Sequence, residues 1–113
     1  MDNPIFTFII LVITGIIILL IGLSNIRGNL SAIHAYHTNN IKPEDKPIFG
    51  KIVGIGHIII GICIIIKGIL SFMATYKNIA VFSQIGNAVL ISGTVIGLVI
   101  IFYALFKYNK KSK

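Results

Sequence analysis

Two ionisable side chains lie inside a long apolar stretch of this sequence. His57 and Lys67 both belong to residues 48–73, which read IFGKIVGIGHIIIGICIIIKGILSFM. An ionisable group in such surroundings is a candidate for proton transfer or for the lining of a polar path, because an apolar medium solvates it poorly. The alternative for His57 is a neutral ring that hydrogen-bonds a neighbouring helix, and we expect this structural role.

Amide and hydroxyl side chains interrupt the next apolar stretch, residues 79–106. They are Ser83, Gln84, Asn87, Ser92 and Thr94. If this stretch runs antiparallel to residues 48–73, counting depth from the end that is assigned to the cytoplasm below places Gln84 and Asn87 near Lys67. The same counting places Thr94 or Gly97 opposite His57. Such groups either join helices through hydrogen bonds worth about 1 kcal/mol each or line a wet groove, and we expect the first role.

The other two histidines lie in a polar connection, residues 24–47. His34 and His37 are three residues apart and could share a metal ion, but no third ligand is evident nearby, so we expect neither metal nor cofactor. With Tyr36 they form a candidate contact surface for a partner. Nucleophile arrangements, phosphate-binding glycine loops and paired catalytic carboxylates are missing, and we therefore expect no enzymatic activity.

Two helical signals occur in this connection. Leu30, Ile33 and His37 fall on one helical face, which predicts a short interfacial helix. Pro43 followed by two acidic residues is typical of a helix start, and this helix would run on into the next apolar segment.

The composition indicates that lipid surrounds much of the chain. Of its 113 residues, 56% are hydrophobic and only 12% charged, whereas about a quarter are charged in a typical soluble domain. The net charge of +7 could indicate nucleic acid. However, the basic residues lie at the ends of apolar segments rather than along one face, so no nucleic-acid partner is expected. The single cysteine, Cys63, allows no internal disulfide and is expected to be buried and inert.

Three apolar segments position all of these side chains. Residues 5–23, 48–73 and 79–106 are each long enough to cross a hydrocarbon core of about 30 Å as a helix that rises about 1.5 Å per residue. They are too long for strands and lack the alternation of membrane barrels. Residues 1–113 are therefore predicted to form one domain, an all-α integral membrane protein with three transmembrane helices. The first helix is expected to be retained, because no Lys or Arg precedes it.

The distribution of lysine and arginine predicts the topology. Most of these residues lie in the connection 24–47 and in the basic tail 107–113, while the turn near residues 75–78 has only Lys77. With three spans the connection and the tail share one side, which the positive-inside tendency assigns to the cytoplasm. We expect a multi-pass protein of the plasma membrane with its N-terminus outside.

Glycines recur seven residues apart in all three segments. The predicted packing positions are Gly15 and Gly22, then Gly54, Gly61 and Gly68, then Gly86 and Gly93; Gly97 joins them through the G-x-x-x-G pair that it forms with Gly93. Seven residues are close to two helical turns, so each set forms a stripe along which a neighbouring backbone can approach. Whether these stripes pack within one chain or between chains stays open.

A longer pattern extends from the connection into the second segment. It consists of Ile33-His34-x-Tyr36-His37, Glu44-Asp45, Gly54-Ile55-Gly56 and Gly61. In this order, over about residues 29–68, the chain resembles an uncharacterised family of small prokaryotic membrane proteins, a domain of unknown function with a His-x-Tyr-His loop between its first two helices. The resemblance implies a three-helix membrane protein with a patterned cytoplasmic loop, and it implies no activity.

These features favour a protein of the lipid bilayer that acts by contacts with itself or with another membrane protein, in an accessory, regulatory or immunity-type role. One alternative is a holin-like pore former, and another is an oligomeric transporter of ions or small molecules that would use the polar side chains of its spans. No acidic residue occurs within the spans, which weighs against proton-coupled machinery that relies on a buried carboxylate.

Overall fold

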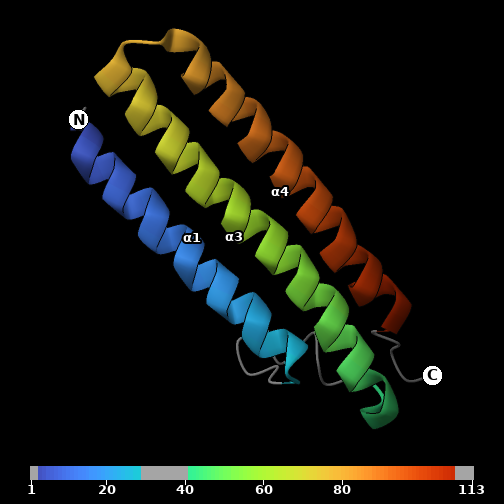
Figure 1. The fold of residues 1–113 in the computed structure, drawn as a ribbon. Coiled ribbons are helices and arrows are strands. Elements are labelled where there is room, and N and C mark those ends of the chain that lie inside the picture. Colours follow the sequence, from blue (N-terminus) through green and yellow to red (C-terminus); the bar gives the residue numbers. More distant parts are fainter. Residues whose placement is uncertain (1–2, 29–40, 109–113) are drawn as a thin grey trace.

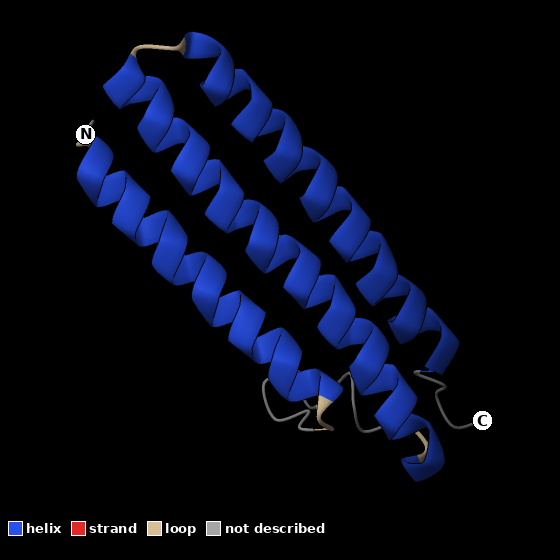
Figure 2. Cartoon of the chain, in the orientation of Figure 1, coloured by secondary structure: helices blue, strands red, loops and turns tan. Residues whose placement is uncertain are grey.

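The computed structural model describes residues 3–28 and 41–108, and every regular element in these ranges is helical (Figures 1 and 2). The elements are helix α1 (Pro4–Ile26), the 3₁₀ turn η1 (Pro43–Asp45), helix α3 (Lys46–Lys77) and helix α4 (Ala80–Tyr108). Helices α1, α3 and α4 are all long and apolar enough to cross a membrane. The predicted all-α architecture with three such helices is therefore confirmed.

Helix α1 begins with a capped first turn. The Oδ1 atom of Asn3 accepts hydrogen bonds from the backbone N–H groups of Ile5 and Phe6, at 3.0 and 3.2 Å. Pro4 occupies the first turn, where it has no N–H group to leave unsatisfied. The helix extends to Ile26, three residues beyond the predicted apolar core 5–23.

Helix α3 starts earlier than its apolar core. The turn η1 begins at Pro43, as the sequence predicts for a helix start, and leads directly into α3 at Lys46. Pro47 lies in the first turn of α3, a position that tolerates proline because the first N–H groups of a helix have no intrahelical acceptor. The second span is consequently a helix of 32 residues, longer than residues 48–73.

A tight turn at Asn78 makes α3 and α4 antiparallel neighbours. Asn78 adopts the left-handed conformation with φ 56° and ψ 43°, which asparagine tolerates better than most residues. The N–H of the next residue, Ile79, donates to the carbonyl of Ala74 at 3.0 Å. This reversal lets α4 begin at Ala80 and run back along α3.

The three helices lie in a row with α3 in the middle (Figure 1). Helix α1 packs along one side of α3 and α4 along another, whereas α1 and α4 share no comparable contact in the described part of the chain. The N-terminus and the turn at Asn78 are at one end of the row, and the ends of α1 and α4 are at the other (Figure 1).

Buried apolar side chains gather at the end of the row where α3 begins. Ile41, Phe49, Val53 and Ala104 are at most 4% exposed and form one cluster. Ile41 lies in the last part of the first connection, so the chain returns against α3 and α4 at this point. The predicted interfacial helix over residues 30–37 lies outside the described residues.

Candidate functional site

Helices α1 and α3 meet at paired glycines. A Cβ added to Gly22 would lie 2.6 Å from the carbonyl oxygen of Gly54, closer than van der Waals contact allows. Gly68 is also against α1, since its added Cβ would lie 3.1 Å from the Cβ of Leu11. Absent side chains therefore let two backbones touch along this contact, as in other membrane helix pairs.

Helices α3 and α4 meet along a different line on α3. A Cβ on Gly56 would lie 2.8 Å from the carbonyl oxygen of Gly97, and a Cβ on Gly93 would lie 2.7 Å from the Cβ of Cys63. Gly56 is a packing residue that the seven-residue pattern misses, because it has no glycine seven positions away. The signal for it is its offset of two residues from Gly54, which rotates it by about 200° to the opposite side of the helix.

Because α1 and α4 cover opposite sides of α3, the row has two broad faces, one of which we call the polar face. Its members on α3 are His57, Lys67, Ser71 and Thr75; on α1 they are Thr7 and Thr14; and on α4 they are Asn87 and Thr94. Two observations place residues of α1 and α4 on this side. Lys67 bonds Asn87, and a cavity is lined by Thr7, Ser71 and Thr75. The other members follow at helical spacing, since residues seven apart share a side.

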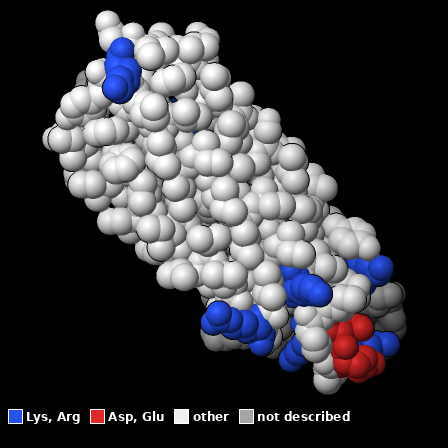
Figure 3. All heavy atoms as spheres, viewed as in Figure 1, with Lys and Arg blue, Asp and Glu red and all other residues white. Residues whose placement is uncertain are grey.

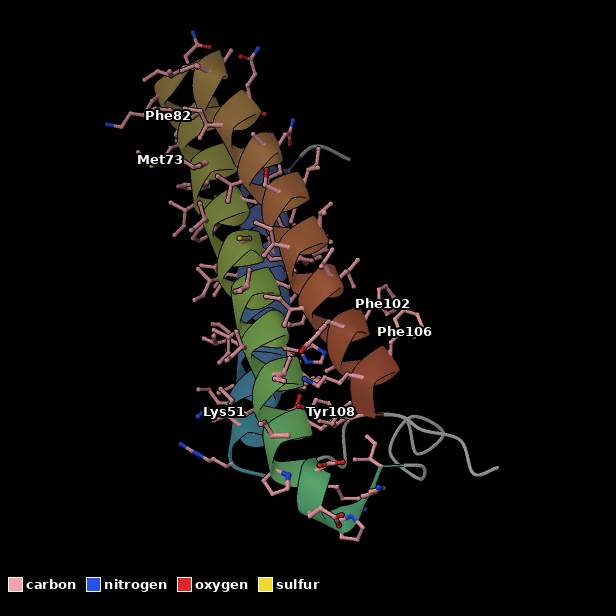
Figure 4. All side chains as sticks on the ribbon, turned by 90° about the vertical axis from the view of Figure 1, so that its right-hand side faces the viewer. Lys51, Met73, Phe82, Phe102, Phe106 and Tyr108 are labelled. Atoms are coloured by element: carbon pink, nitrogen blue, oxygen red, sulfur yellow. The ribbon has the colours of Figure 1, made fainter. Side chains whose placement is uncertain are left out.

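The opposite face of α3 is apolar. Ile55, Ile62, Ile66 and Ile69 project there and are 37 to 44% exposed. Met73 and Lys51 lie on this same side of α3 in Figure 4. This face is toward the viewer in Figure 3, where the charged side chains gather at its two ends. We call this the apolar face; its isoleucines are suited to lipid.

Lys67 is the central group of the polar face. Its Nζ donates to Oδ1 of Asn87 at 2.5 Å, and its stem passes over Gly86, whose added Cβ would lie 3.3 Å from Cδ of Lys67. The antiparallel counting correctly predicts that Lys67 lies near Asn87. The amine is held by α4 near its own depth. Gln84 is exposed, and the described residues show no hydrogen bond between it and Lys67.

His57 is half-buried beside the contact with α1. Its Nδ1 donates to the carbonyl of Val53, one turn earlier on the same helix, at 3.1 Å. The level across the row agrees with the prediction, because Gly97 packs against Gly56 and Ile60, which flank His57. The ring is thus bonded to its own helix, and the described residues show no hydrogen bond to Thr94.

A cavity of about 220 Å³ lies between α1 and α3 at the end near the Asn78 turn. Thr7, Ser71 and Thr75 supply its hydroxyl groups, and the Oγ1 of Thr75 donates to the carbonyl of Ser71 at 3.2 Å. Ser71 is one turn after Lys67 on α3, so the cavity and the lysine belong to one polar region. Within the described residues no group of three or more His, Cys, Asp or Glu side chains is placed to hold a metal ion.

Comparison with family models, curated proteins and solved structures finds no match. The candidate contact residues His34, Tyr36 and His37 lie outside the described residues, as does most of the basic tail. The resemblance to a family with a His-x-Tyr-His loop accordingly stays a hypothesis.

Proposed function

We propose that this chain is a non-enzymatic membrane protein that works through lateral contacts with protein in the bilayer, in an accessory, regulatory or immunity-type role. The observation that carries the proposal is the polar face of an open row. Three helices in one layer leave Lys67, His57 and several hydroxyls on a side that neither α1 nor α4 covers. Lipid solvates such groups poorly, and a protein neighbour would cover them.

The same proposal includes an orientation in the plasma membrane, with the N-terminus outside and the C-terminus in the cytoplasm. The described basic residues support it. Arg27, Lys42, Lys46, Lys51 and Lys107 lie toward the end of the row where α3 begins, while Lys77 ends α3 at the other end. Most of the blue side chains in Figure 3 are accordingly at one end of the row. A surplus of lysine and arginine on short connections is typical of the cytoplasmic side.

The mass of the full chain in mild detergent, measured by light scattering, tests the proposal. We expect a complex larger than a monomer, which Lys67→Met weakens and the apolar-face control Ile66→Ala leaves intact. Substitution of His34, Tyr36 or His37 by alanine tests in the same way whether the first connection also holds a partner. A monomer with no bound protein in every variant would refute the contact role.

A pore former or oligomeric transporter is the second candidate, and the polar face favours it too. Several copies that turned this face inward would line a shared path with Lys67, Asn87 and His57. Flux of ions or dye through vesicles that contain the purified chain distinguishes the two roles. We expect no flux above that of empty vesicles and no change with His57→Ala; a clear pH-dependent flux that His57→Ala alters would favour transport.

A further inference from the structure

Lys67 has no counter-charge on the described helices. The chain holds three acidic residues, Asp2, Glu44 and Asp45. The latter two lie in η1, before the start of α3, and a rise of about 1.5 Å per residue places Asp45 about 33 Å from Lys67 along the axis. Asn87 accepts a hydrogen bond from the amine but is neutral. The described part of the chain therefore satisfies one N–H of Lys67 and leaves its charge uncompensated.

The depth of Lys67 makes its charge unfavourable in free energy. Lys51 and Lys77 lie toward opposite ends of α3, and Lys67 is about 24 Å from the first and about 15 Å from the second along the axis. A hydrocarbon core of about 30 Å centred between them places Lys67 about 10 Å below its nearer edge. A side chain tends to lean toward the N-terminus of its helix, and here that direction points away from the nearer edge.

The polar face around Lys67 selects a protein carboxylate over other occupants. A second copy facing it across a two-fold axis along the membrane normal would set lysine against lysine, and the spans have no acid to offer. A lipid phosphate lies beyond the hydrocarbon edge, whereas Asn87 holds the amine near its own depth. A carboxylate on a neighbouring transmembrane helix has the required charge at the required depth.

We propose that the polar face docks a transmembrane helix of another protein that carries Asp or Glu near the middle of its span, with the carboxylate paired to Lys67. The half-buried Ser71, one turn further along α3, flanks that contact, and the hydroxyl-lined cavity beyond it accepts side chains of the docked helix. This inference rests on the proposed contact function and names its partner chemistry.

A synthetic helix tests the pairing directly. The full chain, labelled with a donor fluorophore at its C-terminus, is placed in phosphatidylcholine vesicles with an acceptor-labelled Leu/Ala transmembrane peptide that has one central Asp. A matched peptide with central Asn controls for hydrogen bonding without charge. We expect energy transfer to show about tenfold tighter association with the Asp peptide, a size that model-peptide studies give for polar contacts between membrane helices. Lys67→Arg should keep this preference and Lys67→Met should abolish it.

A face swap provides the matched control. The double variant Lys67→Met/Ile66→Lys keeps the number of charges and nearly the same depth, but moves the amine to the apolar face. We expect no preference for the Asp peptide in this variant, with helicity by circular dichroism equal to that of the native chain. A preference equal to the native one would show that the polar face is not the docking surface.

Four other results would overturn the inference. The first is equal association of the native chain with both peptides, and the second is Lys67-dependent self-association without peptide. The third is loss of the preference on adding phosphatidylglycerol, because an anionic headgroup then occupies the site. The fourth is a preference that appears only after Asp2→Asn. The detergent mass measurement is independent of these, so an intact complex alongside equal peptide binding would refute the carboxylate pairing and leave the contact function standing.

Discussion

Gly15 and Gly61 face each other across the contact between α1 and α3 with no side chain between them. A Cβ added to either residue would lie 2.7 Å from the carbonyl oxygen of the other. Because the obstructing atoms belong to the backbone, no change of rotamer relieves the overlap, and a larger residue must move a whole helix. The two helices can therefore lie this close only if both positions are glycine.

A graded series of glycine substitutions follows from this geometry. Gly61→Ala should destabilise the protein by about 1–3 kcal/mol, the usual range for overpacking. Gly86→Ala should have a smaller effect, because its added Cβ would first meet the flexible stem of Lys67 at 3.3 Å. Unfolding by sodium dodecyl sulfate in mixed micelles, followed by circular dichroism, measures both. Equal effects would contradict the backbone contact at Gly61.

The native Cys63 offers a test of the contact between α3 and α4. A Cβ on Gly93 would lie 2.7 Å from the Cβ of Cys63, whereas a disulfide needs about 3.5–4.5 Å, so a small separation of the helices suffices. Gly93→Cys should form an internal disulfide on mild oxidation, and Ile91→Cys, at a side chain 64% exposed, should not. Mass spectrometry after thiol alkylation counts the free thiols. Two free thiols in oxidised Gly93→Cys would show that the helices do not meet there.

The hydrogen bond between Lys67 and Asn87 should appear as a coupling energy. In a double-mutant cycle with Lys67→Met and Asn87→Leu we expect about 0.6 kcal/mol, the average for polar pairs between membrane helices, with an upper limit of about 1.7 kcal/mol. The pair Lys67→Met with Ser92→Ala is the control, since Ser92 is exposed and has no bond with Lys67 among the described residues. A coupling that does not exceed the control would mean that the bond adds nothing to stability.

The cap at Asn3 should stabilise the start of α1. Its Oδ1 satisfies two backbone N–H groups, so Asn3→Ala should cost about 0.5–2 kcal/mol and increase fraying of the first turn. Asn3→Asp retains the acceptor and should be nearly neutral. Amide hydrogen exchange at Ile5 and Phe6 in detergent reports the effect locally; unchanged protection in the alanine variant would contradict the capping role.

The proposed orientation gives a simple reporter prediction. A fluorescent protein fused after Lys113 should be fluorescent, because such reporters mature in the cytoplasm, and alkaline phosphatase at the same position should be inactive. Phosphatase placed in the turn at Asn78 should be active, because one span separates that turn from the C-terminus. The reverse pattern would show that the topology is inverted and that Lys51 and Lys107 do not lie on the cytoplasmic side.

Much of the site could be derived from the sequence, because the depth of a residue along a helix follows from its position in the chain. Two antiparallel helices that cross the same layer must place residues equally far from one surface at the same level. Counting depth from the cytoplasmic end therefore places Gln84 and Asn87 near Lys67 and sets Thr94 or Gly97 opposite His57, and of these the structure bonds Asn87 to Lys67. Counting cannot say toward which neighbour a side chain is directed, and it left both the bond of His57 to Val53 and the contact of Gly56 with α4 undetected.

The sequence by itself determined three apolar helices and the order of their residues in depth, because hydropathy and helical rise are local properties of the chain. Only the tertiary structure decided that α3 lies between α1 and α4, and hence that Gly54 faces one neighbour while Gly56 faces the other. Which helix occupies the middle depends on contacts between distant segments. That choice leaves Lys67 on the side of the row that neither α1 nor α4 covers, and this position is the basis of the carboxylate partner that we propose.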